Sequence, residues 1–123
     1  MGGIKVATTK EYKDFILEQL ELLDNITCKA MMGEYLLYYN NILFGGIYDN
    51  RLLVKIVNSN KKYNMRERRP YENAKSMYLV DDIDNKGILK EIVIETYNGL
   101  TSITKIHKYN ARNWITKLYY SNK

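Results

Sequence analysis

Clustered basic side chains are the residues of this sequence whose types and spacing could do chemistry. Three arginines fall within a polar stretch at 58–71, and further basic residues follow in the C-terminal segment. Guanidinium and ammonium groups bind carboxylates and phosphates, so these positions predict an interaction patch for an acidic protein or a nucleic acid. A solvated surface without a ligand is the alternative interpretation. The candidate residues are Arg66, Arg68, Arg69, Lys105, Lys108 and Arg112.

Groups suited to catalysis are few. His107 is the only histidine and Cys28 the only cysteine, so the sequence contains no Cys/His spacing for a metal. Three carboxylates at Asp81, Asp82 and Asp84 lack the ligand spacing of a calcium loop, and helix capping with solvation accounts for them. We therefore expect no catalytic residue, no metal site and no cofactor, and we predict that the protein is not an enzyme.

The charge is unevenly distributed along the chain. The formal net charge is +5, but residues 1–85 carry 12 basic and 12 acidic side chains. Residues 86–123 carry 7 basic and 2 acidic side chains, which account for the whole excess. A neutral body with a basic C-terminal segment argues against a main domain built as an electrostatic DNA-binding surface.

Length and composition are typical of one globular domain. The chain has 123 residues, of which 46% are hydrophobic and 27% are charged. No apolar run approaches the roughly 18 residues of a membrane span, and the first residues lack the apolar core of a signal peptide. A single cysteine cannot form an internal disulfide, so we expect a cytoplasmic protein in which Cys28 is a small buried apolar residue.

Two helices are predicted from apolar side chains at helical spacing. The first covers about residues 9–23, with Thr8 and Glu11 as its capping box. The second covers about residues 86–98, with Asp84 or Asn85 as the cap and Gly99 just beyond the last turn. The apolar stripe of the first helix consists of Tyr12, Phe15, Ile16, Leu20 and Leu23.

About five strands are predicted between the helices. Four runs at 26–32, 34–39, 42–48 and 51–57 are joined by short turns, of which Asn40-Asn41 and Asp49-Asn50 are typical of hairpins. Residues 76–80 form the fifth strand, and the segment 58–71 is a short helix or an exposed loop. Gly45-Gly46 inside the third strand indicates a bulge or a close approach by another backbone, such as the first helix. These elements predict an α+β fold, a two-layer antiparallel meander with helices packed on one face.

Tyrosine is abundant in the predicted strands. Interleaved tyrosine and basic residues can stack nucleobases, whereas tyrosine is also a common strand residue with a polar tip. Few basic residues accompany the tyrosines, which favours the structural interpretation. Those on the meander are Tyr35, Tyr38, Tyr39 and Tyr48.

Several segments occur in an order that resembles a known family. They are Thr9–Leu20, Ala30–Tyr35, Tyr38-Tyr39, Gly45–Asp49, Arg51–Lys55, Pro70–Glu72 and Ser76–Leu79. Together they resemble the TfoX/Sxy N-terminal domain family, which is named after a regulator of bacterial competence. The resemblance covers residues 8–98 and implies a two-layer domain similar to the secretion-chaperone-like and YjbR-like folds. Residues 99–123 form a basic C-terminal extension without an assignment.

The resemblance also implies a function. A domain of this type is a non-enzymatic regulatory module that acts through a transcription factor, the cyclic-AMP receptor protein, on genes for DNA transformation. The expected partner is therefore a protein or a second copy of the chain, with no membrane involved. The 25 residues after 98 are too few for the regulator's second domain, so we expect a stand-alone N-terminal domain. Direct, weakly specific nucleic-acid binding through the basic connector and C-terminal segment is the alternative.

Overall fold

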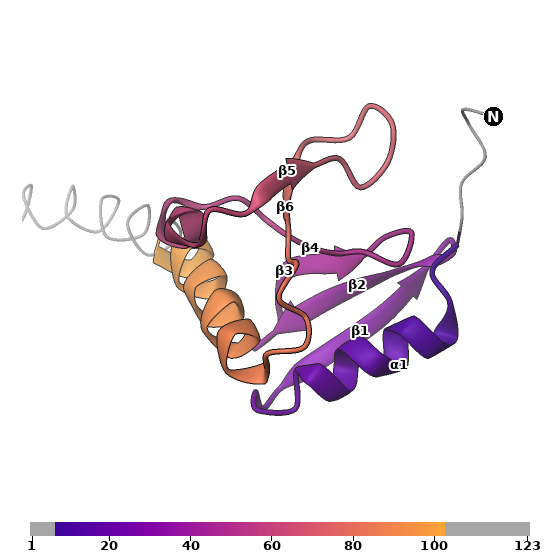
Figure 1. Cartoon of the computed structure of the whole chain (residues 1–123), viewed down its shortest axis with the longest axis horizontal. Coiled ribbons are helices and arrows are strands. Elements are labelled where there is room, and N and C mark those ends of the chain that lie inside the picture. The colour runs from indigo at the N-terminus through magenta and orange to yellow at the C-terminus, as the bar shows by residue number, and fades with distance from the viewer. Residues whose placement is uncertain (1–6, 103–123) are drawn as a thin grey trace, which may run out of the picture.

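Six strands form one open antiparallel sheet in the computed structural model, which describes residues 7–102 (Figure 1). The strand order is β1-β2-β3-β4-β6-β5, so β1 and β5 are the two edges. The α+β fold class is confirmed, with six strands where about five were expected. The strands are β1 (Ile26–Met31), β2 (Glu34–Tyr39), β3 (Ile42–Ile47), β4 (Leu52–Val54), β5 (Arg66–Arg68) and β6 (Met77–Leu79).

The predicted turns of the meander are confirmed by their backbone angles. Asn40 and Asn41, between β2 and β3, have φ values of 49° and 65°. Asp49 and Asn50, between β3 and β4, have φ values of 53° and 52°. Two consecutive positive φ angles are the requirement of a type I′ turn, and Asn and Asp tolerate them better than other residues with a Cβ atom.

Helix α1 (Lys10–Gln19) begins one residue later than the sequence predicted. Thr9, not Thr8, is its N-cap, since the Thr9 hydroxyl accepts a hydrogen bond from the Tyr12 N–H at 3.1 Å. Thr8 is buried and lies 3.2 Å from a carboxylate oxygen of Glu34, while its hydroxyl accepts a hydrogen bond from the Asn50 N–H. The predicted capping box is therefore wrong, because tertiary contacts engage Thr8 elsewhere.

A second helix, drawn in orange in Figure 1, includes residues 86–102. Asn85 caps it by accepting a hydrogen bond from the Ile88 N–H at 3.0 Å. Of the two residues predicted as the cap, Asp84 and Asn85, the structure therefore selects Asn85. The prediction that Gly99 follows the last turn is wrong, because the helix continues past it. A Cβ atom at Gly99 would lie 2.6 Å from both Ser59 Oγ and Val57 Cγ2. The glycine permits a close approach between this helix and the connector.

The connector between β4 and β5 contains a 3₁₀ helix, η1 (Asn58–Tyr63), so of the two predicted alternatives the short helix is present. Asn60 is fully buried and holds this segment in place. Its amide oxygen accepts a hydrogen bond from the Val57 N–H, and its amide nitrogen donates to the Lys55 carbonyl and the Thr96 hydroxyl. These bonds tie the connector to the second helix, and residues 66–68, which follow the connector, pair with β6.

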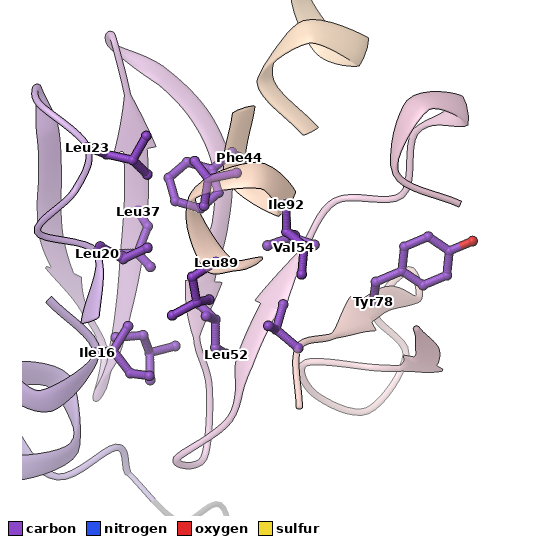
Figure 2. Packing of buried hydrophobic residues seen from close by; sticks show 13 residues of the cluster. Ile16, Leu20, Leu23, Leu37, Phe44, Leu52, Val54, Tyr78, Leu89 and Ile92 are labelled. Carbon is purple, nitrogen blue, oxygen red and sulfur yellow. The ribbon is translucent and has the colours of Figure 1, made fainter. Parts of the chain in front are cut away.

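One hydrophobic core lies between the sheet and both helices (Figure 2). Ile16 and Leu20 of α1 pack in the same cluster as Leu37 and Phe44 of the sheet and Leu89 of the second helix. The side chain of Tyr78 lies at the margin of this cluster with its hydroxyl directed away from it. The predicted apolar stripe of α1 and the packing of both helices on one sheet face are confirmed.

The predicted bulge is present in β3. The register of β2 and β3 shifts between Leu37 and Tyr38. A Cβ atom at Gly45 would lie 2.2 Å from the Leu53 carbonyl oxygen, and one at Gly46 would lie 2.6 Å from the Tyr35 carbonyl oxygen. The close approach therefore comes from the neighbouring strands and not from the first helix.

Candidate interaction surface

Among residues 7–102, both helices pack on one face of the sheet, and the opposite, helix-free face has its own apolar cluster. Tyr48, Leu53 and Met77 are buried there, with Leu36 and Leu79 packed against them, in a cluster separate from the helix-contacting core. Residues directly opposite one another in an antiparallel pair lie on the same face of the sheet. This rule allows the candidate basic residues to be assigned to a face.

Arg66 and Arg68 lie on the helix-free face. They are on the edge strand β5, opposite Leu79 and Met77 respectively. Both arginines are exposed, as is Arg69, which follows the strand. The structure therefore brings these three predicted residues together on one edge, and we call Arg66, Arg68 and Arg69 the arginine edge. Lys105, Lys108 and Arg112 lie outside the described residues.

The arginine edge is only partly neutralised. Arg66 Nη2 lies 3.2 Å from an Asp81 carboxylate oxygen, with both side chains more than half exposed. Arg68 donates a hydrogen bond to the carbonyl of its neighbour Glu67. Within residues 7–102, no ion pair is recorded for Arg68 or Arg69. An exposed pair such as Arg66–Asp81 contributes little energy, so it leaves the guanidinium available to a competing carboxylate.

Arg51 positions this edge, and sequence reasoning did not single it out. Its guanidinium donates to the carbonyls of Arg69 and Pro70 at 3.2 and 3.1 Å, and its Nε donates to the Tyr48 carbonyl at 3.1 Å. One side chain therefore links the turn before β4 to the chain that leaves β5. The signal available in the sequence was its place beside the Asp49-Asn50 turn, which does not reveal a partner 18 residues away.

A groove of about 810 Å³ opens next to the apolar cluster of this face. Leu43, Gly45 and Met77 line it from the sheet, and the loop 69–76 between β5 and β6 contributes further apolar residues. Ile56 and Leu100 belong to the same lining. This size lies within the range of about 300–1,000 Å³ that is usual for small-molecule sites, which are mostly apolar with a few polar groups.

The charged side chains that line the groove have a net positive charge. Lys55 and Lys75 contribute two ammonium groups and Glu67 one carboxylate. No ion pair is recorded for either lysine among residues 7–102. Burial raises the pKa of the Tyr48 hydroxyl, with smaller contributions from the nearby Tyr71 and from Glu34 and Tyr38. Tyr48 therefore remains a protonated hydrogen-bond donor over the physiological pH range.

The groove contrasts with the charge of the domain as a whole. Residues 7–102 contain 13 Lys and Arg against 14 Asp and Glu, a net charge of −1. The basic groups of the groove and of the arginine edge are therefore local features on a nearly neutral domain.

The other candidate groups for chemistry are Cys28, the three carboxylates at 81–84 and His107. In the part of the chain that the structure describes, no three His, Cys, Asp or Glu side chains are close enough to hold a metal ion. Cys28 is half-buried against the core, and burial raises the pKa of its thiol. Asp81 pairs with Arg66, and Asn85 rather than Asp84 caps the helix. His107 lies outside the described residues.

The tyrosines of the meander have structural contacts. Tyr39 packs edge-on against Tyr97 of the second helix, with ring centroids 5.0 Å apart. The Lys13 ammonium lies 5.5 Å from the ring centroid of Tyr35. Both contacts are between the sheet and a helix, which agrees with the structural interpretation of these two tyrosines.

Comparison with known proteins gives one relative. The chain is 30% identical over 80 residues to a protein of Spirochaeta aurantia described as an "Uncharacterized 12.7 kDa protein in trpE 5'region". The aligned region covers 63% of this chain and 70% of that protein. The chain belongs to the same family as this protein.

No family model matches the chain. No solved structure matches it. Within residues 7–102, no helix has both the length and the apolar character needed to cross a membrane.

Proposed function

We propose that this protein is a non-enzymatic interaction module that binds an acidic segment of a protein partner at the arginine edge. The observation that carries the proposal is an open sheet that ends in an exposed strand bearing Arg66 and Arg68. An edge strand presents unpaired backbone groups to which an extended peptide can add as a further strand. Acidic side chains of such a peptide would reach the guanidinium groups on the helix-free face.

The charge balance favours a protein over a nucleic acid. A nucleic-acid-binding face usually combines many lysines and arginines into a broad positive surface. Residues 7–102 have a net charge of −1, and Asp81 faces Arg66 across the edge. A short acidic segment needs only a few guanidinium groups, whereas phosphate binding at physiological salt depends on many simultaneous contacts.

The regulatory role rests on the sequence resemblance to TfoX/Sxy N-terminal domains over residues 8–98. On that basis the partner is a transcription factor, the compartment is the cytoplasm and the process is the regulation of DNA transformation. The α+β fold with both helices on one sheet face is compatible with this role. A second copy of the chain is the other candidate partner, because β1 is also an unpaired edge strand to which another strand could add.

Direct nucleic-acid binding is the second candidate function. One observation favours it: residues 103–123 contain five basic and no acidic side chains. Such a segment would add phosphate contacts to those of the arginine edge. The prediction is binding to duplex DNA at about 50 mM salt that falls steeply at about 200 mM, because counterion release makes phosphate binding salt-dependent.

The test compares two double variants in binding assays with the full chain. Arg66→Gln/Arg68→Gln removes two charges from the arginine edge, and Lys61→Gln/Lys90→Gln removes two exposed charges from η1 and the second helix. A partner captured from native cells is identified, purified and titrated against each variant. We expect the arginine variant to weaken binding at least about tenfold and the lysine variant to leave it unchanged. Equal affinities for both variants would exclude the arginine edge as the site.

A further inference from the structure

The groove opens beside the apolar cluster of the helix-free face and extends to Leu100 of the second helix. Arg66, Arg68 and Arg69 are not part of its lining, although Glu67 of β5 is. The other lining residues come from β3, β6, the loop 69–76, the turn before β4 and the start of the connector. Its largest walls are apolar, and its volume of about 810 Å³ exceeds what a single partner side chain would fill. These properties fit a small molecule better than a protein surface.

We propose that this groove binds a small amphiphilic anion, a molecule with an apolar or aromatic body and one carboxylate or comparable negative group. The apolar body would lie against Leu43, Met77 and Tyr48, and its anionic group would reach the ammonium groups of Lys55 and Lys75. The ligand adds a function to the proposed interaction module and does not depend on it.

The net positive charge of the groove lining favours a ligand with a negative charge. The two lysines outnumber the one carboxylate, Glu67, and neither lysine has an ion-pair partner among residues 7–102. Lys55 is half-buried, so part of its side chain packs against the groove wall. A charge-assisted hydrogen bond to an anion is stronger than a bond between neutral groups, so an anion is preferred to a neutral molecule of equal shape.

The loop 69–76 holds the groove open. Pro70 is buried, and the Arg51 guanidinium binds the carbonyls of Arg69 and Pro70, which fixes the start of the loop relative to β4. Arg51 also donates a hydrogen bond to the Tyr48 carbonyl. The Tyr48 ring packs over Gly46, where a Cβ atom would lie 2.8 Å from the ring. Both anchors are contacts within the protein itself, and preorganisation of this kind lowers the entropic cost of binding.

The test uses two dyes that differ in charge. 8-Anilinonaphthalene-1-sulfonate is an aromatic anion, and N-phenyl-1-naphthylamine is its neutral counterpart without the sulfonate. Fluorescence titration of the full chain should show that the anion binds and that Lys55→Gln/Lys75→Gln weakens it about tenfold or more. The same variant should change the affinity of the neutral dye less than about twofold, and Lys61→Gln/Lys90→Gln should change neither.

Amide NMR spectra locate the dye and complete the test. The proposal predicts shifts at residues 43–48 and 70–77 on addition of the anion, with α1 unaffected. Three results would overturn the proposal. They are no binding of the anionic dye, an equal loss of affinity for both dyes in Lys55→Gln/Lys75→Gln, or amide chemical-shift changes confined to other parts of the chain. Because the variants differ from those at the arginine edge, loss of dye binding and loss of partner binding are independent outcomes.

Discussion

Replacing Gly45 by alanine should destabilise the protein strongly, because no space exists for a Cβ atom. The new atom would lie 2.2 Å from the Leu53 carbonyl oxygen and 2.9 Å from the Val54 Cα atom. A carbon atom normally approaches a carbonyl oxygen to about 3.3–3.6 Å, so β3 and β4 would have to separate by roughly 1 Å. Both obstructing atoms belong to the backbone and cannot turn aside.

The magnitude follows from the contacts that this separation would disturb. Gly45 is opposite Val54 on one side and Leu37 on the other, and it is buried between them. Overpacking costs about 1–3 kcal/mol, and a weakened ladder hydrogen bond costs about 0.5–1.5 kcal/mol. We expect a loss of about 3 kcal/mol in the free energy of unfolding, which lowers Tm by roughly 12–24 °C in a domain of this size.

The assay is chemical and thermal unfolding of Gly45→Ala beside the matched control Gly87→Ala. Gly87 is in the first turn of the second helix, and a Cβ atom there would meet only the Asn85 Oδ1 atom at an ordinary 3.5 Å. Alanine at this position should stabilise the helix by about 0.5–1 kcal/mol. A loss below about 0.5 kcal/mol for Gly45→Ala, the size of a surface substitution, would refute the packing of β3 against β4.

Three further predictions concern capping, the connector and the cysteine. Thr9→Ala should cost about 1 kcal/mol through the lost helix cap, whereas Thr8→Ala should cost more, since it removes a buried hydroxyl that binds Asn50; urea titration of both variants distinguishes them. Asn60→Ala should cost about 2–4 kcal/mol by leaving buried backbone groups without partners, and unchanged urea stability would contradict the connector structure. The raised thiol pKa of Cys28 means less thiolate at a given pH, so its alkylation rate should reach half-maximum at a higher pH in the folded protein than in the unfolded chain.

Much of the architecture followed from local sequence patterns. The stripe of α1, the paired Asn and Asp residues at the turns and the alternating strand runs are each decided by neighbours within a few residues. Such features survive in the fold because the local preference and the global packing agree. The α+β class could therefore be predicted, and so could the position of Arg66, Arg68 and Arg69 in one exposed cluster.

The elements that sequence reasoning missed depend on distant partners. Residues 66–68 form a strand only because β6 lies beside them, since three polar, charged residues have little strand preference of their own. Thr8 and Thr9 are equally good caps in isolation, and the contacts of Thr8 with Glu34 and Asn50 decide between them. Glycine is common just after the last turn of a helix, but Gly99 lies within the helix and lets it approach Val57 and Ser59.

The sequence by itself determined the helices, the meander and the local concentration of arginines, because periodicity and turn chemistry are short-range properties. Only the tertiary structure decided that Arg66 and Arg68 share a sheet face with Met77 and Leu79, and that a groove lined by Lys55 opens beside this face. The physical reason is that a groove is made by segments brought together from β3, the connector and the loop before β6. Their separation along the chain carries no record of the distances between them in the folded protein.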